Sequence, residues 1–356
     1  MAEASLFDVR PRPEWLALHD EEVLLPGLPI VDAHHHLWQR AHERYLLEEF
    51  EADLADGHRV VATVHVQCGS AYRQSGPLGF APVGETEFAS AVARQSLRGG
   101  GGTHVCAGIV GYADLRGIDA EQVLRAHIAA DPLRFKGIRQ ATAWDVDARL
   151  VNPRMGTMPG LYRQPDFRRG FALLAPLGLS FDAWALHPQL ADVLALARAF
   201  PDTSIVINHI GAPLGAGRFA GRHAQVYPAW LADMQSLAGC ANVCVKLGGL
   251  GLPVLGFDFG QASRPLSSAE LAERMRPWIE PCIEAFGAAR CMFESNFPVD
   301  RCAYRYKLCW NAFKRLAVDC SDAERALLFH GAATRVYRLD SPATTSSARG
   351  KTRAGS

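Results

Sequence analysis

The sequence has no long apolar run and no excess of charge of one sign. No stretch approaches the roughly 18 uncharged apolar residues that suggest a membrane-spanning helix, so no membrane association is expected. The 37 Lys and Arg residues equal the 37 Asp and Glu residues in number, which leaves no global field to draw the chain onto nucleic acid or an anionic membrane. A small-molecule partner is therefore expected, and the sequence leaves homo-oligomerisation open.

Signals for export and for disulfide bonding are also missing. The N-terminal segment is acidic and interrupted by proline, without the basic start and continuous apolar stretch of a secretory signal. The nine cysteines form no C-x-x-C pair, and buried free thiols in a reducing compartment account for them best. Together these absences predict a cytoplasmic protein.

Short apolar, β-rich runs alternate with amphipathic segments along most of the chain. The candidate strands are 29–36, 59–67, 104–112, 134–140, 179–184, 204–210, 242–248 and 290–296. Helix-like segments lie at 84–97, 119–130, 188–200, 227–237 and 267–286. This alternation favours an α/β fold of the (β/α)₈ TIM-barrel type over an open sheet, and no G-x-G-x-x-G motif after the first strand suggests a nucleotide site.

The same pattern predicts one barrel domain over residues 28–340, preceded by an N-terminal extension over 1–27. Residues 341–356 are polar and low in apolar side chains, which predicts a disordered C-terminal tail. The loop at 149–162 contains prolines and an aromatic residue. It is expected either to cover the mouth of the barrel as a lid or to run as an ordered surface connection.

The first strand ends in three successive histidines. Side chains alternate along a strand, so Asp32, His34 and His36 are expected on one face and His35 on the other. Catalytic groups of a barrel lie at the C-terminal ends of its strands, which is where this pair falls. Two imidazoles about 7 Å apart can converge on a divalent metal or on two oxygens of a substrate group. Packing or capping at the strand end is the structural alternative.

Later strands also end in polar residues. Asn208 and His209 close the sixth strand, where His209 is either a polar cap or a ligand or catalyst beside the first-strand pair. On the eighth strand Glu294 and Asn296 share a face. A charged Glu in a barrel core is costly unless paired, so Glu294 is expected either to be hydrogen-bonded structurally or to act as a functional acid. Asp300 follows in a loop, where a solvated side chain is expected.

Two basic residues lie at or near strand ends and are candidates for substrate binding. Arg139 belongs to the fourth strand and Lys246 to the seventh, and the fork of an Arg suits a substrate carboxylate. Both could instead form internal ion pairs with Glu294 or Asp182. On the second strand, His65 is expected to line the floor of the pocket.

Four motifs occur in an order and at separations that resemble the amidohydrolase-related barrel family. They are VDAHHHLW at 31–38, INHIG at 207–211, VKLGGL at 245–250 and FESNFPVD at 293–300. The sequence looks most similar to the sugar-lactone and 2-pyrone-4,6-dicarboxylate lactonases, and the likeness extends over nearly the whole chain. The first motif is fairly specific, whereas INHIG and VKLGG are persuasive only in combination with it.

The resemblance implies roles for individual residues. His34 and His36 would be the strand-one pair, His209 the later-strand histidine, and Arg139 a candidate for holding substrate. Some members of the family bind zinc or another divalent ion through such histidines, so His34, His36 and His209 are the expected metal ligands, with zinc as the first choice. The pyrone-dicarboxylate lactonases work without metal, and the ligand set alone does not choose between the two.

The strand-eight motif departs from the family. The family usually carries Ser-Asp-Trp-Pro where this chain reads SNFP at 295–298, so that Asn296 stands in the place of the general base. An amide does not titrate in the useful range, and loss of a positioned base costs on the order of 10²-fold to 10⁴-fold in rate. Three explanations are open: Glu294 or His209 supplies the base, a metal-bound water reduces the need for one, or hydrolysis has been lost.

The resulting hypothesis is a hydrolase that opens a lactone or related cyclic ester of a small substrate, with or without a carboxylate. His34 and His36 would polarise the carbonyl, Asn296 would orient groups by hydrogen bonds, and Glu294 or His209 would move protons. The alternatives are a metal-dependent decarboxylase of the same superfamily and a catalytically silent binding barrel, for which Asn296 is the main support.

Overall fold

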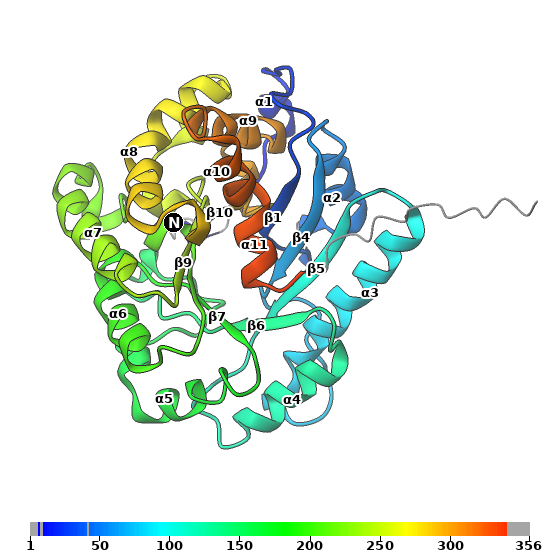
Figure 1. Cartoon of the computed structure of the whole chain (residues 1–356), viewed down its shortest axis with the longest axis vertical. Coiled ribbons are helices and arrows are strands. Elements are labelled where there is room, and N and C mark those ends of the chain that lie inside the picture. The colour runs from blue at the N-terminus through cyan, green and yellow to red at the C-terminus, as the bar shows by residue number, and fades with distance from the viewer. Residues whose placement is uncertain (1–5, 8–9, 41–42, 340–356) are drawn as a thin grey trace, which may run out of the picture.

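The computed structural model describes residues 6–7, 10–40 and 43–339. Its centre is one sheet of eight parallel strands in the order β1-β4-β5-β6-β7-β8-β9-β10 (Figure 1). The strands are β1 (Ile30–His35), β4 (Val60–Val66), β5 (His104–Gly111), β6 (Phe135–Arg139), β7 (Ser180–Ala183), β8 (Ile205–Ile207), β9 (Val243–Leu247) and β10 (Cys291–Phe293). All eight predicted strands and the predicted barrel are therefore confirmed. The predicted disordered tail at 341–356 lies outside the described residues.

The sheet closes into a barrel between its first and last strands. Backbone N–H of Asn296 donates to the carbonyl of His34 at 2.9 Å, and N–H of His36 donates to that of Phe297 at 2.7 Å. A parallel bridge also pairs His35 with Phe297. These bonds bring the histidines of the first strand directly beside the strand-eight motif.

Helices cover the outside of the barrel (Figure 1). The five predicted helices are confirmed as α3 (Val83–Gly99), α4 (Ala120–Ala130), α6 (Leu190–Ala199), α7 (His223–Ala238) and α8 (Ser268–Phe286). Ser267 caps α8 by accepting a hydrogen bond from N–H of Glu270, a capping box that the sequence signals. Elements that were not predicted are α1 (Pro13–Leu16), α2 (Leu47–Leu54), α5 (Pro165–Phe171), α9 (Tyr306–Leu316), α10 (Asp322–Ala326), α11 (Ala332–Val336), and the hairpin β2 (Trp38–Arg40) and β3 (Glu43–Tyr45).

Two apolar clusters hold these layers together. The larger lies between the strands and the surrounding helices. The smaller fills the barrel and includes Val31, Val206 and Met292 together with Tyr337, which follows α11. Because α11 and the residues after it pack against this inner cluster, the chain between Ala332 and Leu339 closes one end of the barrel. The polar residues considered below lie toward the other end.

The regular alternation predicted for β1 is wrong at one position. Asp32 does not share a face with His34 and His36, because its carboxylate accepts a hydrogen bond from the Tyr306 hydroxyl of α9, outside the barrel, at 3.1 Å. The pairing register of β1 with β4 shifts between Asp32 and His35. This irregularity lets His34 and His36 both face the interior while Asp32 faces the helices.

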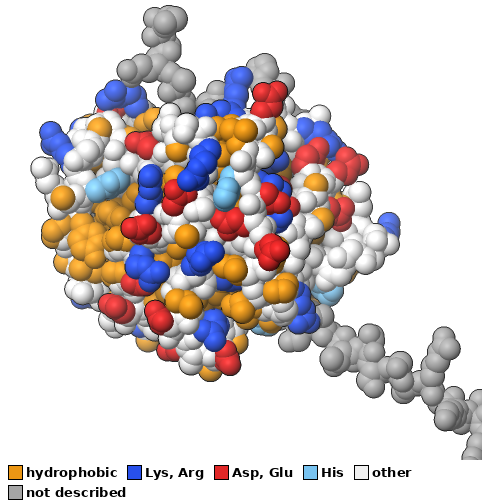
Figure 2. Space-filling model, turned by 90° about the horizontal axis from the view of Figure 1, so that it is seen from above, with side chains coloured by type: hydrophobic (Ala, Val, Ile, Leu, Met, Phe, Trp, Pro, Cys, Tyr) orange, Lys and Arg blue, Asp and Glu red, His pale blue; other side chains and the backbone are white. Residues whose placement is uncertain are grey.

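The surface carries no extended patch of one charge in the view of Figure 2, where basic and acidic side chains are interspersed. This distribution agrees with the balanced composition. Within the described parts of the chain, no helix has both the length and the apolar character needed to cross a bilayer.

Candidate active site

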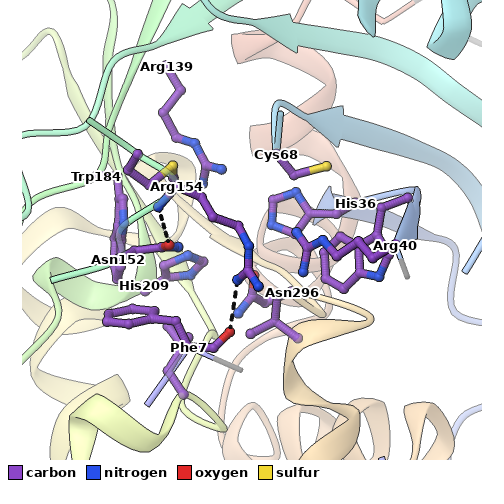
Figure 3. A pocket seen from close by; sticks show the side chains of 14 residues that line it. Phe7, His36, Arg40, Cys68, Arg139, Asn152, Arg154, Trp184, His209 and Asn296 are labelled. Carbon is purple, nitrogen blue, oxygen red and sulfur yellow. Dashed lines mark hydrogen bonds between the residues drawn. The ribbon is translucent and has the colours of Figure 1, made fainter. Parts of the chain in front are cut away.

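A pocket lies at the C-terminal ends of the barrel strands, where (β/α)₈ enzymes place their active sites. Its lining residues are Phe7, His36, Trp38, Arg40, Cys68, Arg139, Asn152, Arg154, Met155, Trp184, His209, Leu252, Asn296 and Val299 (Figure 3). Four of the predicted site residues, His36, Arg139, His209 and Asn296, are therefore in its wall. The other three, His34, Lys246 and Glu294, lie beneath it, fully buried.

Glu294 lies between two histidines at the floor of the pocket. Its Oε1 accepts hydrogen bonds from Nδ1 of His209 at 2.7 Å and from the backbone N–H of the same residue at 3.1 Å. Its Oε2 is 2.7 Å from Nδ1 of His34, at an angle outside that of a good hydrogen bond. Since an anionic oxygen this close would repel a lone pair, both Nδ1 atoms carry the proton. Each Nε2 is then left with a lone pair.

The two histidines of the first strand approach each other through these free nitrogens. Nε2 of His34 is 3.2 Å from Nε2 of His36. Nδ1 of His36 donates to the carbonyl of Val66 at 2.7 Å, so its Nε2 also carries a lone pair. Burial lowers the pKa of both imidazoles well below the usual value, assisted by the positive charges of Lys246 for His34 and of Arg139 for His36. Both are therefore neutral at pH 7 and able to act as ligands or hydrogen-bond acceptors.

This arrangement satisfies the donor requirements of a divalent metal. Two zinc-bound nitrogens at tetrahedral angles lie about 3.4 Å apart, close to the 3.2 Å between His34 and His36. His34, His209 and Glu294 also offer ligand atoms that lie within 4.8 Å of one another. A carboxylate behind a histidine is the usual support of a metal-bound imidazole, and Glu294 has that position for two of them.

Two glycines after β9 make room for this cluster. A Cβ on Gly249 would lie 2.1 Å from Nδ1 of His209, and a Cβ on Gly248 would lie 2.3 Å from the carbonyl oxygen of Glu294. Gly249 also has a φ of +69°, which favours glycine. The GG of the VKLGG motif is therefore required by the packing of His209 and Glu294 against it.

Asn296 is held by a buried carboxylate. Its side-chain Nδ2 donates to Oδ1 of Asp300 at 2.8 Å, which leaves Oδ1 of Asn296 to accept a hydrogen bond from a ligand. Asp300 also accepts from the N–H of Gly251 at 2.9 Å and from the Tyr304 hydroxyl. The expectation that Asp300 is solvated is wrong, because it is fully buried, and this burial raises its pKa to about 7.

Lys246 pairs inside the barrel. Its Nζ lies 2.6 Å from Oδ2 of Asp182, and neither side chain is exposed. Asp182 also accepts from the Tyr337 hydroxyl at 3.0 Å and from Nδ2 of Asn208 at 3.0 Å. Nζ of Lys246 is 3.4 Å from Nδ1 of His34, so the lysine contacts the histidine cluster from below rather than the pocket.

Arg139 contributes a positive charge to the pocket wall. One guanidinium nitrogen donates to the carbonyl of Gln67, and Nη1 lies 3.4 Å from Nε2 of His34. Its Nε–H is buried and has no partner among the described residues. The prediction that His65 lines the pocket floor is wrong, because His65 lies on the outer side of β4, 3.5 Å from Glu85 of α3.

Three of the remaining wall residues, Asn152, Arg154 and Met155, belong to the loop at 149–162, which was expected either to cover the mouth of the barrel or to run over the surface. The other walls were not predicted. Trp38 stacks on His36 with ring centroids 5.9 Å apart, and Trp184 meets His209 edge-on at 4.7 Å. Nη1 of Arg154 donates to the carbonyl of Phe7 at 3.4 Å, so the N-terminal segment also reaches the pocket (Figure 3). Trp38 directly follows the histidines, but the roles of Phe7 and Trp184 have no local sequence signal.

Comparison with known proteins relates this architecture to enzymes. Over 338 residues, the chain is 34% identical to the uncharacterized protein y4mH of Sinorhizobium fredii (88% of this chain, 100% of that protein). It is 29% identical over 334 residues to L-fucono-1,5-lactonase of Burkholderia ambifaria (88% and 96% covered). An amidohydrolase of Burkholderia multivorans solved with bound zinc is 25% identical, with a TM-score of 0.68 (87% and 99% covered).

A family model described as amidohydrolase matches residues 31–339. That range contains all the predicted site residues and the whole barrel sheet except Ile30, the first residue of β1. The chain therefore belongs to the amidohydrolase family.

Proposed function

We propose that the chain hydrolyses a lactone or related cyclic ester of a small molecule. The observation that carries this proposal is the buried Glu294 carboxylate, which holds Nδ1 of His209 at 2.7 Å while His209 lines the pocket. Similarity to an L-fucono-1,5-lactonase over most of both chains supports the reaction class.

His209 is the residue best placed to take a proton from the attacking water. Asn296 has no titratable group, and both oxygens of Glu294 face imidazole nitrogens beneath the pocket. With Nδ1 protonated and held by Glu294, Nε2 of His209 can accept the proton. The carboxylate then stabilises the imidazolium that forms, as the acid of a catalytic triad does.

The developing charge on the carbonyl oxygen needs a positive or hydrogen-bonding partner. Arg139 lies in the pocket wall, so its guanidinium can hold the oxyanion or a substrate carboxylate. Oδ1 of Asn296 can accept a hydrogen bond from the water or from a substrate hydroxyl. Trp38 and Trp184 offer flat apolar surfaces for a ring.

A divalent metal fits the same donors. His34 and His36 would hold it. His209 would be the third ligand if it does not act as the base. Zinc is the first choice because imidazole ligands suit it. When bound, such an ion lowers the pKa of water and polarises a carbonyl oxygen. The positive charge of Arg139, 3.4 Å from Nε2 of His34, would have to move aside or pair with substrate.

The test is hydrolysis of a panel of aldonolactones and aromatic lactones, combined with elemental analysis of the purified protein. We expect His209→Gln and Glu294→Gln to lower kcat by about 10²-fold to 10⁴-fold. The matched control is His187→Gln, a buried histidine outside the pocket, which should retain activity.

The metal content separates the two roles of His209. If His209 is the base, His209→Gln keeps the metal content of the wild type and loses turnover, whereas His36→Ala loses one equivalent of metal. If His209 is a ligand, both variants lose one equivalent. Full activity in Glu294→Gln would contradict the proposed pair.

Asn296 supports one further candidate, a barrel that binds ligands without turning them over. Lactone binding by calorimetry in the absence of any turnover would favour that function over hydrolysis. Release of carbon dioxide from an aromatic carboxylate would instead favour the decarboxylase alternative.

A further inference from the structure

The side of β1 that faces away from the pocket carries a second group of metal-binding side chains. His35 of β1, His65 of β4 and Cys106 of β5 are fully buried, and one ligand atom from each lies within 4.8 Å of the others. Strand pairing brings them together, because His35 is the register partner of His65 and β4 lies next to β5. None of the three lines the pocket.

Their polar atoms are poorly satisfied by the protein. Neither ring nitrogen of His65 has a hydrogen-bond partner among the described residues, and Nδ1 of His35 has none either. Leaving a buried polar group unpaired costs about 1–3 kcal/mol, and apolar side chains of similar size would avoid that cost. Cys106 also has a φ of +52°, a conformation that non-glycine residues seldom adopt without a compensating interaction.

The spacing is close to that of a zinc site. Sγ of Cys106 is 3.9 Å from Nε2 of His35, and in tetrahedral zinc coordination a sulfur and a nitrogen ligand lie about 3.6 Å apart. The Thr63 hydroxyl lies 2.9 Å from the same nitrogen. Its oxygen is therefore near enough to occupy the fourth coordination position of a tetrahedral ion. The ligand atoms of all three side chains lie within 4.8 Å of one another, so side-chain shifts of about 1 Å would bring them to a common ion.

A carboxylate stands behind the cluster. Oε1 of Glu85 is 3.5 Å from Nε2 of His65, so Nδ1 of that ring is the nitrogen that can turn to an ion. Glu85 is buried and accepts from the N–H groups of Cys68 and Gly69, and no ion pair with Lys or Arg is found for it among the described residues. A carboxylate that supports a metal-bound histidine in this way is common, and its charge offsets that of the ion.

We propose that His35, His65 and Cys106 form a structural zinc site, separate from the catalytic pocket. Zinc displaces the proton of the Cys106 thiol, which passes to solvent as the sulfur–zinc bond forms, and thiolate with imidazole is a ligand set that zinc prefers. The ion ties β1 to β4 and β5. It also holds His35 in place, and His34 and His36, the residues on either side of His35, face the active site.

Cobalt titration of the chelator-treated full-length chain tests this site. A thiolate-to-cobalt charge-transfer band reports a cysteine ligand, which the pocket histidines cannot supply, and its response to Cys106→Ser distinguishes Cys106 from Cys68 in the pocket wall. We expect the band in the wild type and its loss, with one equivalent of bound metal, in Cys106→Ser. Cys244→Ser, which changes another buried cysteine of a barrel strand, should keep the band, as should His36→Ala in the pocket.

Absence of the band in folded wild type, or its persistence in Cys106→Ser, would overturn the proposal. If Cys106→Ser does not fold, His65→Gln provides the same test, with loss of one equivalent of metal expected. Added zinc should also raise the Tm of the wild type by more than that of either variant. None of these measurements depends on turnover, so they stand or fail independently of the proposed hydrolase.

Discussion

Asn296 has an amide at the position where the family usually carries an Asp carboxylate. The contact with Asp300 indicates the role of this amide. The side-chain N–H of Asn296 donates to Asp300, whose burial raises its pKa to about 7. A carboxylate at 296 would place two acidic groups in contact without an N–H between them. The buried Asp300 carboxyl therefore depends on the side-chain N–H of Asn296. In our proposal His209 accepts the proton instead of residue 296.

We predict that Asn296→Asp destabilises the protein more at pH 8 than at pH 6. Two carboxyl groups 2.8 Å apart must share a proton, so the folded pKa of the pair is raised. The shared proton contributes its whole stabilising free energy at low pH. This contribution is lost as the pH rises through the raised pKa of the pair.

Urea denaturation at the two pH values measures this difference, with a cost of up to about 1.4 kcal/mol per pH unit for one proton. Asn152→Asp is the matched control, because Asn152 accepts a hydrogen bond from N–H of Arg154 through an oxygen that Asp retains. An equal loss of stability at pH 6 and pH 8 would argue against the Asn296–Asp300 contact.

At the scale of elements, the site depends on how each strand ends. β1 loses its regular register before His34, β8 gives way to a turn in which His209 has a φ of +52°, and β9 ends in the two glycines that face His209 and Glu294. These three irregular positions all lie at the proposed site, as expected where local backbone preference is sacrificed to hold a site.

We predict that Gly249→Ala abolishes most activity, because its Cβ would displace the His209 ring from 2.1 Å away. Gly178→Ala is the control, since Gly178 has a similar φ of +66° but nothing within 4 Å of the added Cβ. Both variants should lose about 1–2 kcal/mol of stability from backbone strain, measured by denaturant unfolding. Only Gly249→Ala should lower kcat, and equal activity of the two variants would contradict the steric role.

At the scale of the whole molecule, buried neutral histidines make stability depend on pH. Burial lowers the pKa of six of them. The pKa falls to about 4 for His58, His127 and His187, and well below the usual value for His34, His35 and His36. On unfolding each regains its usual pKa near 6.5 and binds a proton. Their contribution to stability is therefore present above pH 6.5 and is lost as the pH falls toward 4.

Two buried carboxyls act in the opposite direction. Burial raises the pKa of Asp32 to about 6 and that of Asp300 to about 7, and their stabilising protons are lost as the pH rises through these values. Because six histidines outnumber two aspartates, we predict that the free energy of unfolding of the chelator-treated protein decreases between pH 6.5 and 4. His127→Gln should flatten this dependence, and unchanged stability between pH 7 and 5 would contradict the prediction.

The sequence by itself determined the barrel and the main site residues. Eight apolar runs with helices between them specify a parallel barrel, because that alternation is encoded in local periodicity. His34, His36, His209, Glu294 and Asn296 were identifiable because each lies at the end of such a run, and strand ends converge in this fold.

Only the tertiary structure decided which of these residues reach the pocket and which support it. The Lys246–Asp182 ion pair, the burial of Asp300 and the grouping of His35 with His65 and Cys106 depend on strand register and on packing between distant segments. The outward turn of Asp32 depends on a register shift that alternation cannot predict. The local sequence determines where helices and strands form. Contacts between those helices and strands determine where each side chain points, how deeply it is buried and how its pKa shifts.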